Sequence, residues 1–270
     1  MLFPRFCSIL LILSLVPLAG VRAGNLDSAW AEYRFQNWAP ADELFERVIR
    51  DEQAAPDERY QARLGQLLIE QYRMPGNRPD KAIEGYRQLL NEVGPGHALT
   101  PLLHLQIARA YDQLDTPNHA AAFAHFDTLL QRYPRSPEAG EGVVDRARFM
   151  LRTPTAENID TARRFLNEHL PMVQEHAVLP VVHQFCAALA TIQGDYEAAR
   201  DHYIALVDAG VPTEKDRATF LLQIARLSEV ELGDLHTALA YYRRFTEEVI
   251  SDIHLHFAAS KAAEIEEKLR

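Results

Sequence analysis

The stretch from Gly194 to Tyr203, which reads Gly-Asp-Tyr-Glu-Ala-Ala-Arg-Asp-His-Tyr, is the clearest sign of how the chain folds. Gly194 begins a turn, because glycine takes positive φ without strain at the end of a helix. Ala199 and Tyr203 are four residues apart, which places both on one face of a following helix. Ala187 lies in an apolar helical pattern that precedes the turn. The stretch therefore predicts a helix, a tight turn and a second helix.

Alanines spaced 37 to 41 residues apart repeat this arrangement along the chain: Ala41, Ala82, Ala122, Ala162, Ala199 and Ala238. The residues four positions later are Phe45, Tyr86, Phe126, Leu166, Tyr203 and Tyr242, and five of the six are aromatic. A second series of small residues precedes the first and allows close approach of two helix axes: Gly65, Ala108, Ala147, Ala187 and Ala225. The repeating unit is therefore helix A, a turn and helix B.

The two series place the helices along the chain. The expected A helices lie near 27–37, 57–72, 99–114, 138–151, 178–193 and 215–232. The expected B helices lie near 40–52, 80–93, 119–132, 157–169, 196–209 and 236–249, and a terminal helix lies near 252–269. No stretch alternates between apolar and polar residues with a period of two, so the sequence predicts essentially no sheet.

The repeat resembles the tetratricopeptide repeat (TPR). The best match is Gly194 to Ala199 with Tyr203, preceded by Cys186-Ala187, and a second match runs from Ile107 to Pro134. The run Tyr-Pro-Arg-Ser-Pro at 133–137 is similar to repeats of exported bacterial cell-envelope proteins, such as the Tol-Pal coordinator protein and the outer-membrane assembly lipoprotein. The resemblance implies an all-α fold: a right-handed α-solenoid of about six helix-turn-helix repeats over 24–270 with a C-terminal capping helix. The expected repeats lie near 27–53, 57–94, 99–134, 138–175, 178–211 and 215–250, with the cap at 252–270.

Two features depart from the TPR pattern. The period is nearer 40 residues than the 34 of the family, and Leu166 stands where an aromatic residue is expected. HEAT-type helical repeats, whose period is about 40, remain an alternative fold.

Residues 1–23 have the pattern of a secretory signal peptide. Arg5 precedes an almost wholly apolar run at 6–19, which is too short to span a bilayer comfortably. Val21 and Ala23 are small residues at the positions that a signal peptidase reads. No Cys follows the expected cleavage site after Ala23, so we expect a soluble periplasmic or secreted protein without a lipid anchor. An uncleaved anchor is the alternative.

Composition narrows the classes of partner. The 270 residues carry a formal net charge of -10, whereas binding to nucleic acid or to an anionic membrane needs a basic excess. Cys186 is the one cysteine left after cleavage, so an internal disulfide is excluded, and its apolar surroundings predict a buried, inert thiol.

The resemblance also implies a concave groove that is lined by the A helices and holds a peptide. The residues that follow the small A-helix positions are Gln66, Arg109, Arg148, Ala188 and Arg226, and Arg59 and Arg152 extend the series. The arginines form a possible basic stripe that would suit an acidic segment or a C-terminal carboxylate. The alternative is a solvated helix face with local ion pairs, each of which contributes little.

We find no sign of catalysis in the sequence. It contains no nucleophile elbow, zinc-protease motif or phosphate-binding loop, so we expect a non-enzymatic protein without a cofactor. His254 and His256 are two residues apart on an expected helix and point in different directions, which does not suit a metal site.

The sequence thus predicts a non-catalytic scaffold of the bacterial cell envelope that binds a protein partner. The alternative is a structural protein that forms homo-oligomers through the ends of its repeat array. Trp30, Tyr33 and Trp38 could form a sticky edge for such pairing, although packing inside the first repeat explains them more simply.

Overall fold

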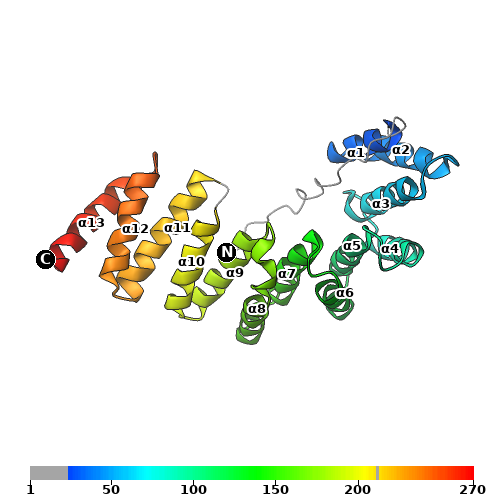
Figure 1. The fold of residues 1–270 in the computed structure, drawn as a ribbon. Helices are drawn as coiled ribbons and strands as arrows, with labels where there is room; N and C mark the ends of the chain where they lie inside the picture. Colours follow the sequence, from blue (N-terminus) through cyan, green and yellow to red (C-terminus); the bar gives the residue numbers. More distant parts are fainter. Residues whose placement is uncertain (1–23, 211–212) are drawn as a thin grey trace. The chain divides into compact units, whose positions relative to one another are not determined.

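The computed structural model describes residues 24–210 and 213–270, and all regular structure in these residues is helical (Figure 1). The predicted signal, residues 1–23, lies outside the described residues. The helices of the first part of the chain are α1 (Gly24–Arg34), α2 (Trp38–Arg50), α3 (Pro56–Tyr72) and α4 (Pro79–Val93). They are followed by α5 (Thr100–Asp112), α6 (His119–Arg132), α7 (Pro137–Met150), α8 (Ala156–His169), α9 (Leu179–Ile192), α10 (Tyr196–Ala209), α11 (Glu214–Arg226), α12 (Leu235–Glu248) and α13 (Leu255–Leu269).

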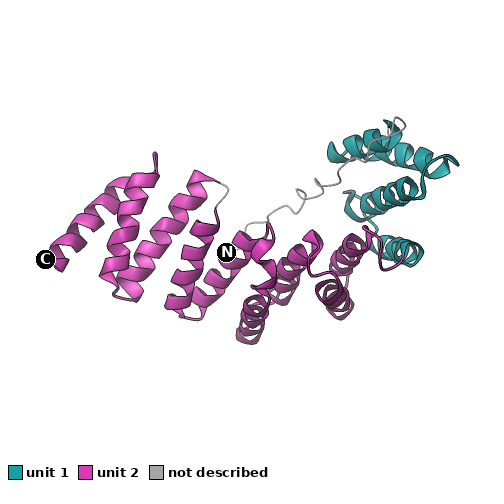
Figure 2. Cartoon of the chain, viewed as in Figure 1, with its two compact units in different colours: residues 1–93 teal, residues 94–270 magenta. Residues whose placement is uncertain are grey.

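The chain divides into two compact units, residues 1–93 and residues 94–270 (Figure 2). In the described part of the first unit, each of the helices α1 to α4 packs against the next, and α1 also packs against α3. In the second unit each of the helices α5 to α13 packs against the next, and α7 also packs against both α5 and α9. Contacts between consecutive helices and between alternate ones are those of stacked helical hairpins. The limits that the sequence gives for the repeats stay a prediction.

The helices agree with the repeat pattern. Every expected helix has a counterpart whose ends lie within about three residues of the expected ones, except near residue 226. There the expected helix 215–232 changes from α11 to a π turn, Leu227–Glu231, in which the N–H of Leu232 donates to the carbonyl of Leu227. A short 3-10 turn, Met172–Glu175, follows Pro171 and was not expected. The helix expected at 27–37 ends at Arg34 because Gln36 takes a left-handed conformation with a φ of 59°.

The turns between A and B helices follow the sequence signals. Gly194 and Gly233 have φ values of 74° and 64°, which confirms their role as turn residues. The side chains of Asp195 and Asp234 then accept the N–H groups of Ala198 at 3.2 Å and Thr237 at 3.0 Å. These bonds cap α10 and α12 and satisfy backbone groups that have no partner inside the helix.

The recurring small residues lie in the core. All six alanines of the B-helix series are fully buried, as are Ala108, Ala147, Ala187 and Ala225 of the A-helix series. A Cβ atom on Gly65 would lie 2.3 Å from the ring of Phe45, so glycine is what allows α3 to approach α2. The two series therefore mark the surfaces on which the helices pack.

Candidate functional site

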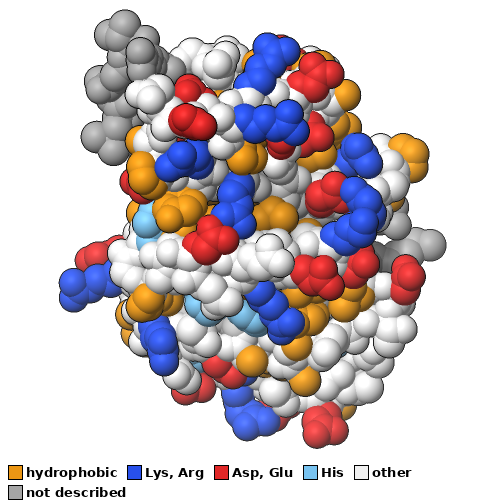
Figure 3. Space-filling view, turned by 90° about the vertical axis from the view of Figure 1, so that its right-hand side faces the viewer, with side chains coloured by type: hydrophobic (Ala, Val, Ile, Leu, Met, Phe, Trp, Pro, Cys, Tyr) orange, Lys and Arg blue, Asp and Glu red, His pale blue; other side chains and the backbone are white. Residues whose placement is uncertain are grey.

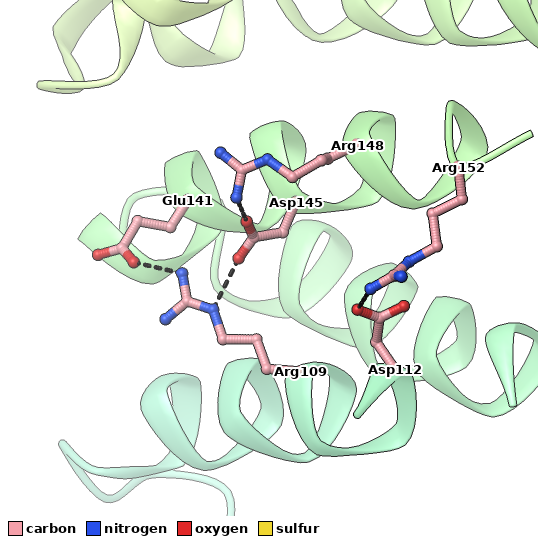
Figure 4. A network of polar contacts seen from close by, with 6 residues as sticks. All are labelled: Arg109, Asp112, Glu141, Asp145, Arg148 and Arg152. Atoms are coloured by element: carbon pink, nitrogen blue, oxygen red, sulfur yellow. Dashed lines mark hydrogen bonds and ion pairs between the residues drawn. The ribbon is translucent and has the colours of Figure 1, made fainter. Parts of the chain in front are cut away.

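Arg109 joins two consecutive A helices of the second unit. Its Nε donates to Oδ2 of Asp145 at 2.7 Å, and its Nη2 donates to Oε2 of Glu141 at 2.7 Å (Figure 4). Arg109 lies on α5 and both carboxylates lie on α7. The side chain of Arg109 is only 16% exposed, so this predicted groove residue contributes mainly to the contact between the two helices.

Arg148 and Arg152 lie on α7 and its C-terminal extension and are more open to solvent. Nη1 of Arg148 donates to Oδ1 of Asp145 at 3.0 Å, and its side chain is 42% exposed. Arg152, at 51% exposure, pairs with Asp112, and its guanidinium lies 5.9 Å from the ring centroid of Phe149. Both side chains thus remain partly exposed to solvent. We refer to Arg109, Asp112, Glu141, Asp145, Arg148 and Arg152 as the α5–α7 charge network (Figure 4).

The α5–α7 charge network is balanced. Its three arginines face three carboxylates, so these residues form a mixed surface and not a purely basic stripe. Burial raises the pKa of Glu141, and the nearby Arg109 acts in the opposite direction. Figure 3 shows the same mixture more widely, with Lys and Arg side chains interspersed among Asp and Glu side chains over the face that it presents.

The other predicted groove residues do not join this network. Gln66 on α3 donates to Oδ1 of Asp42 at 2.9 Å and to Oε2 of Glu46 at 3.2 Å, so it ties α3 to α2 in the first unit. Arg59 lies on α3 and Arg226 on α11, and neither side chain forms an ion pair with another residue in the described ranges. The assignment of these residues to a partner-binding groove stays a prediction.

The repeat pattern indicated the arginines but not the carboxylates that pair with them. Asp145 lies three residues before Arg148, a spacing that places the two on one helix face and that a local search can find. Asp145 lies 36 residues after Arg109, which is close to the repeat period. Opposite charges separated by roughly one repeat are therefore the signal that was available for this contact.

Other residues singled out in the sequence have structural roles in the described part of the chain. Cys186 is fully buried, and burial raises the pKa of its thiol to about 12, which leaves the thiol protonated at neutral pH. Trp30 packs edge-to-face against Tyr33 and Phe45, and Tyr33 packs in the same way against Trp38. The three aromatic residues thus pack against the core of the first unit, as the simpler interpretation expects.

In residues 24–210 and 213–270 no three His, Cys, Asp or Glu side chains are grouped so that they could hold a metal ion. None of the helices in the same ranges combines the length and the apolar character needed to cross a membrane.

Comparisons with known proteins bear on the fold. No protein-family model matches the chain, and no curated protein matches it. The solved structure of the Pseudomonas aeruginosa protein PilF is similar, with a TM-score of 0.54 and 16% identity over 89% of this chain and 97% of that one. A tetratricopeptide repeat protein from Parabacteroides merdae aligns with a TM-score of 0.48 and 18% identity over 91% of this chain and 90% of that one. The chain has an all-α fold of consecutively packed helices that is similar to the fold of PilF.

Proposed function

We propose that the protein is a non-catalytic scaffold of the bacterial cell envelope that binds a segment of a partner protein on the α5–α7 face. TPR-type arrays offer a preformed surface, which lowers the conformational cost of binding an extended segment. The observation that carries the proposal is the half-exposed pair Arg148 on the A helix α7 and Arg152 just after it. Both arginines are paired with carboxylates, and their side chains are still about half exposed to solvent.

The charge balance of the network defines the partner more closely. A ligand carboxylate approaching Arg148 or Arg152 competes with Asp145 or Asp112, which already occupy part of each guanidinium. The partner segment therefore carries a carboxylate, on an acidic side chain or at its C-terminus, together with apolar or polar groups that add contacts. Binding of this kind weakens as salt concentration rises, because part of it is electrostatic.

The predicted signal at 1–23 supports an envelope location. We propose cleavage after Ala23 and release as a soluble periplasmic or secreted protein. Cell fractionation followed by N-terminal sequencing tests this part: a mature chain that begins at Gly24 in the soluble envelope fraction supports it. A cytoplasmic chain that begins at Met1 contradicts it.

In-cell photo-crosslinking tests the binding surface. A photoreactive residue is placed at Arg148 or at Arg152, and in a matched control at Arg164. Arg164 is 72% exposed on the B helix α8, and its side chain pairs with Asp160 of the same helix. One crosslinked partner from positions 148 and 152, with none from 164, supports the proposal, and equal crosslinking from all three positions contradicts it.

Self-assembly is a second candidate function, and one observation favours it. The segment between α12 and α13 exposes Ile250 at 86% and Ile253 at 90%, and Phe257 at the start of α13 is 41% exposed. A second copy of the chain could cover these apolar side chains. Light scattering of the chain after cleavage, beside an Ile250→Ser/Ile253→Ser variant, tests this: a dimer that the variant turns into a monomer supports it, and a monomer in both excludes it.

A further inference from the structure

Two pairs of histidines link an A helix to its B helix in the second unit. Nδ1 of His104 on α5 lies 3.0 Å from Nδ1 of His125 on α6. Nδ1 of His183 on α9 lies 3.1 Å from Nδ1 of His202 on α10. At this separation one imidazole donates a hydrogen bond and the other accepts it. Each pair is therefore a direct polar link between two packed helices.

The two pairs occupy equivalent places in their repeats. His104 and His183 each lie four residues before a buried alanine of the A-helix series, and His125 and His202 each lie three residues after a buried alanine of the B-helix series. In two other repeats of the second unit the same places hold apolar or aromatic residues: Val143 with Phe165, and Leu221 with Tyr241. The histidines thus replace hydrophobic contacts at a position where helices A and B pack.

Protonation changes these links in two steps. The first added proton can go to a remote Nε2 and leave the hydrogen bond between the Nδ1 atoms in place. The second proton removes the last acceptor, so two donors and two positive charges then face each other at about 3 Å. In a partly buried site this repulsion is poorly screened by solvent. Full protonation is therefore incompatible with the observed packing.

The surroundings of the first pair disfavour positive charge. Burial lowers the pKa of His104, and the positive charge of Arg132 on α6 lowers it further. The rings of Tyr133 and Tyr111 lie beside the pair, each 6.1 Å from one of the imidazoles. Helix α7 packs against α5 and α6, and four of its charged side chains pair with other residues: Glu141 and Asp145 with Arg109, Arg148 with Asp145, and Arg146 with Asp127.

The second pair has a similar environment. Burial lowers the pKa of His183 and of His202, and for His202 the charges of His183 and of Arg163 on α8 act in the same direction. Asp201 and Asp195 on the α10 side act in the opposite direction and do not outweigh them. Helix α11 and the π turn Leu227–Glu231 also pack against α10. There Arg217 forms an ion pair with Glu248, and Glu229 accepts hydrogen bonds from Tyr242 and Lys261.

We propose that the two histidine pairs make the helix pairs α5–α6 and α9–α10 sensitive to acid, so that full protonation separates helix A from helix B at these two places. The sign follows from the lowered pKa values, because the unfolded chain then binds more protons than the folded one. Stability is complete above the ordinary histidine pKa of about 6.5 and falls as the pH drops from there toward the lowered pKa values. The acid-induced separation of these helix pairs is a property in addition to partner binding, and it does not depend on the proposed partner.

Hydrogen–deuterium exchange of the full chain at pH 7.5 and pH 5.5, corrected for intrinsic rates, tests the proposal. We expect local opening of α5, α6, α9 and α10 to increase about tenfold or more at pH 5.5, which corresponds to about one pKa unit of coupling. Opening of α12 stays nearly unchanged. A uniform increase over all helices of the unit overturns the proposal.

The other repeats supply the matched variants. His104→Val/His125→Phe and His183→Leu/His202→Tyr place the residues of equivalent repeats at the two sites, and each removes the acid-induced opening of its own helix pair. His254→Gln/His256→Gln, which changes two exposed histidines, is the control and keeps the opening. If the double variants open at pH 5.5 as the original chain does, the proposal is wrong.

NMR titration of the unaltered chain keeps the proposal testable if a variant fails to fold. We expect His104, His183 and His202 to titrate below the ordinary histidine pKa of about 6.5, and titration of all three at that ordinary value overturns the proposal. Zn²⁺ is the rival ligand of such a pair, although nearby Arg132 and Arg163 disfavour a cation. Stabilisation by Zn²⁺ at pH 7.5 without opening at pH 5.5 would mark the pairs as metal sites and also overturn the proposal.

Discussion

Asp195 uses its two carboxylate oxygens for two different contacts. Oδ1 accepts the N–H of Ala198 and caps α10, while Oδ2 accepts Nη2 of Arg163 on α8. The next repeat has the same arrangement, in which Asp234 caps α12 with Oδ1 and accepts Nη1 of Arg200 on α10 at 3.4 Å with Oδ2. Arg163 and Arg200 each follow the buried alanine of their B helix. A single aspartate therefore starts one B helix and ties it to the preceding one.

Removal of either arginine should destabilise the second unit. Arg163 and Arg200 are 18% and 17% exposed, so they are shielded from solvent more than ordinary surface charges. We expect Arg163→Ala and Arg200→Ala each to lower the free energy of unfolding by about 1 kcal/mol. Urea titration measures the change. Arg164→Ala, a change at a highly exposed neighbour, should alter it by less than about 0.5 kcal/mol, and a loss of equal size in all three variants contradicts the account.

Two substitutions of Asp195 separate the capping hydrogen bond with Ala198 from the ion pair with Arg163. Asp195→Asn keeps an acceptor for the N–H of Ala198 and loses the ion pair, whereas Asp195→Ala loses both. We expect the alanine variant to be less stable than the asparagine variant by about 1 kcal/mol. Equal stability of the two variants in urea would show that the cap contributes nothing.

The lowered pKa of Asp195 predicts in which direction the stability of the fold changes with pH. The hydrogen bond from Arg163 is the largest cause that lowers the pKa of Asp195 in the folded protein. Its contribution to stability is therefore present above the ordinary aspartate pKa of about 3.9 and is lost as the pH falls from there through the lowered pKa. We expect the stability difference between the original chain and Asp195→Asn to shrink between about pH 4.5 and pH 2.5, as measured by urea titration. A difference that stays constant over this range contradicts the prediction.

Gly65→Ala tests the close approach of α3 and α2. The new methyl group would lie 2.3 Å from the Phe45 ring, so the ring or a helix must move. We expect a loss of about 1–3 kcal/mol in thermal or urea unfolding of the first unit. Gly24→Ala is the matched control in the same unit, because a Cβ there meets no atom within 4 Å. Gly65→Ala with full stability would mean that the two helices do not need a glycine at their contact.

Most of the helical architecture follows from local sequence signals. Ala199 with Tyr203, and the turn glycine Gly194, are short-range features that act within one hairpin, and they were enough to predict α9 and α10. The exception is the π turn after Arg226, in which the bond pattern changes inside a helix that the sequence pattern continues to Leu232. No residue type in Leu227–Glu231 marks where the helix widens.

The polar contacts between helices were not predictable in the same way. Arg109 meets Asp145 across 36 residues, and His104 meets His125 across 21 residues. These partners depend on how one helix is rotated against another, which the apolar periodicity does not determine to within one residue. The arginines at groove positions could therefore be identified while their charge balance could not.

The most direct test of the proposed function compares binding of the crosslinked partner to three purified proteins. They are the original chain, Arg148→Ala/Arg152→Ala and Arg164→Ala, each checked for helical content. We expect the double variant to bind about tenfold or more weakly, equivalent to loss of about 1.4 kcal/mol, and the Arg164 variant to bind as the original chain does. Equal affinity of all three folded proteins would contradict the assignment of the partner to the α5–α7 face.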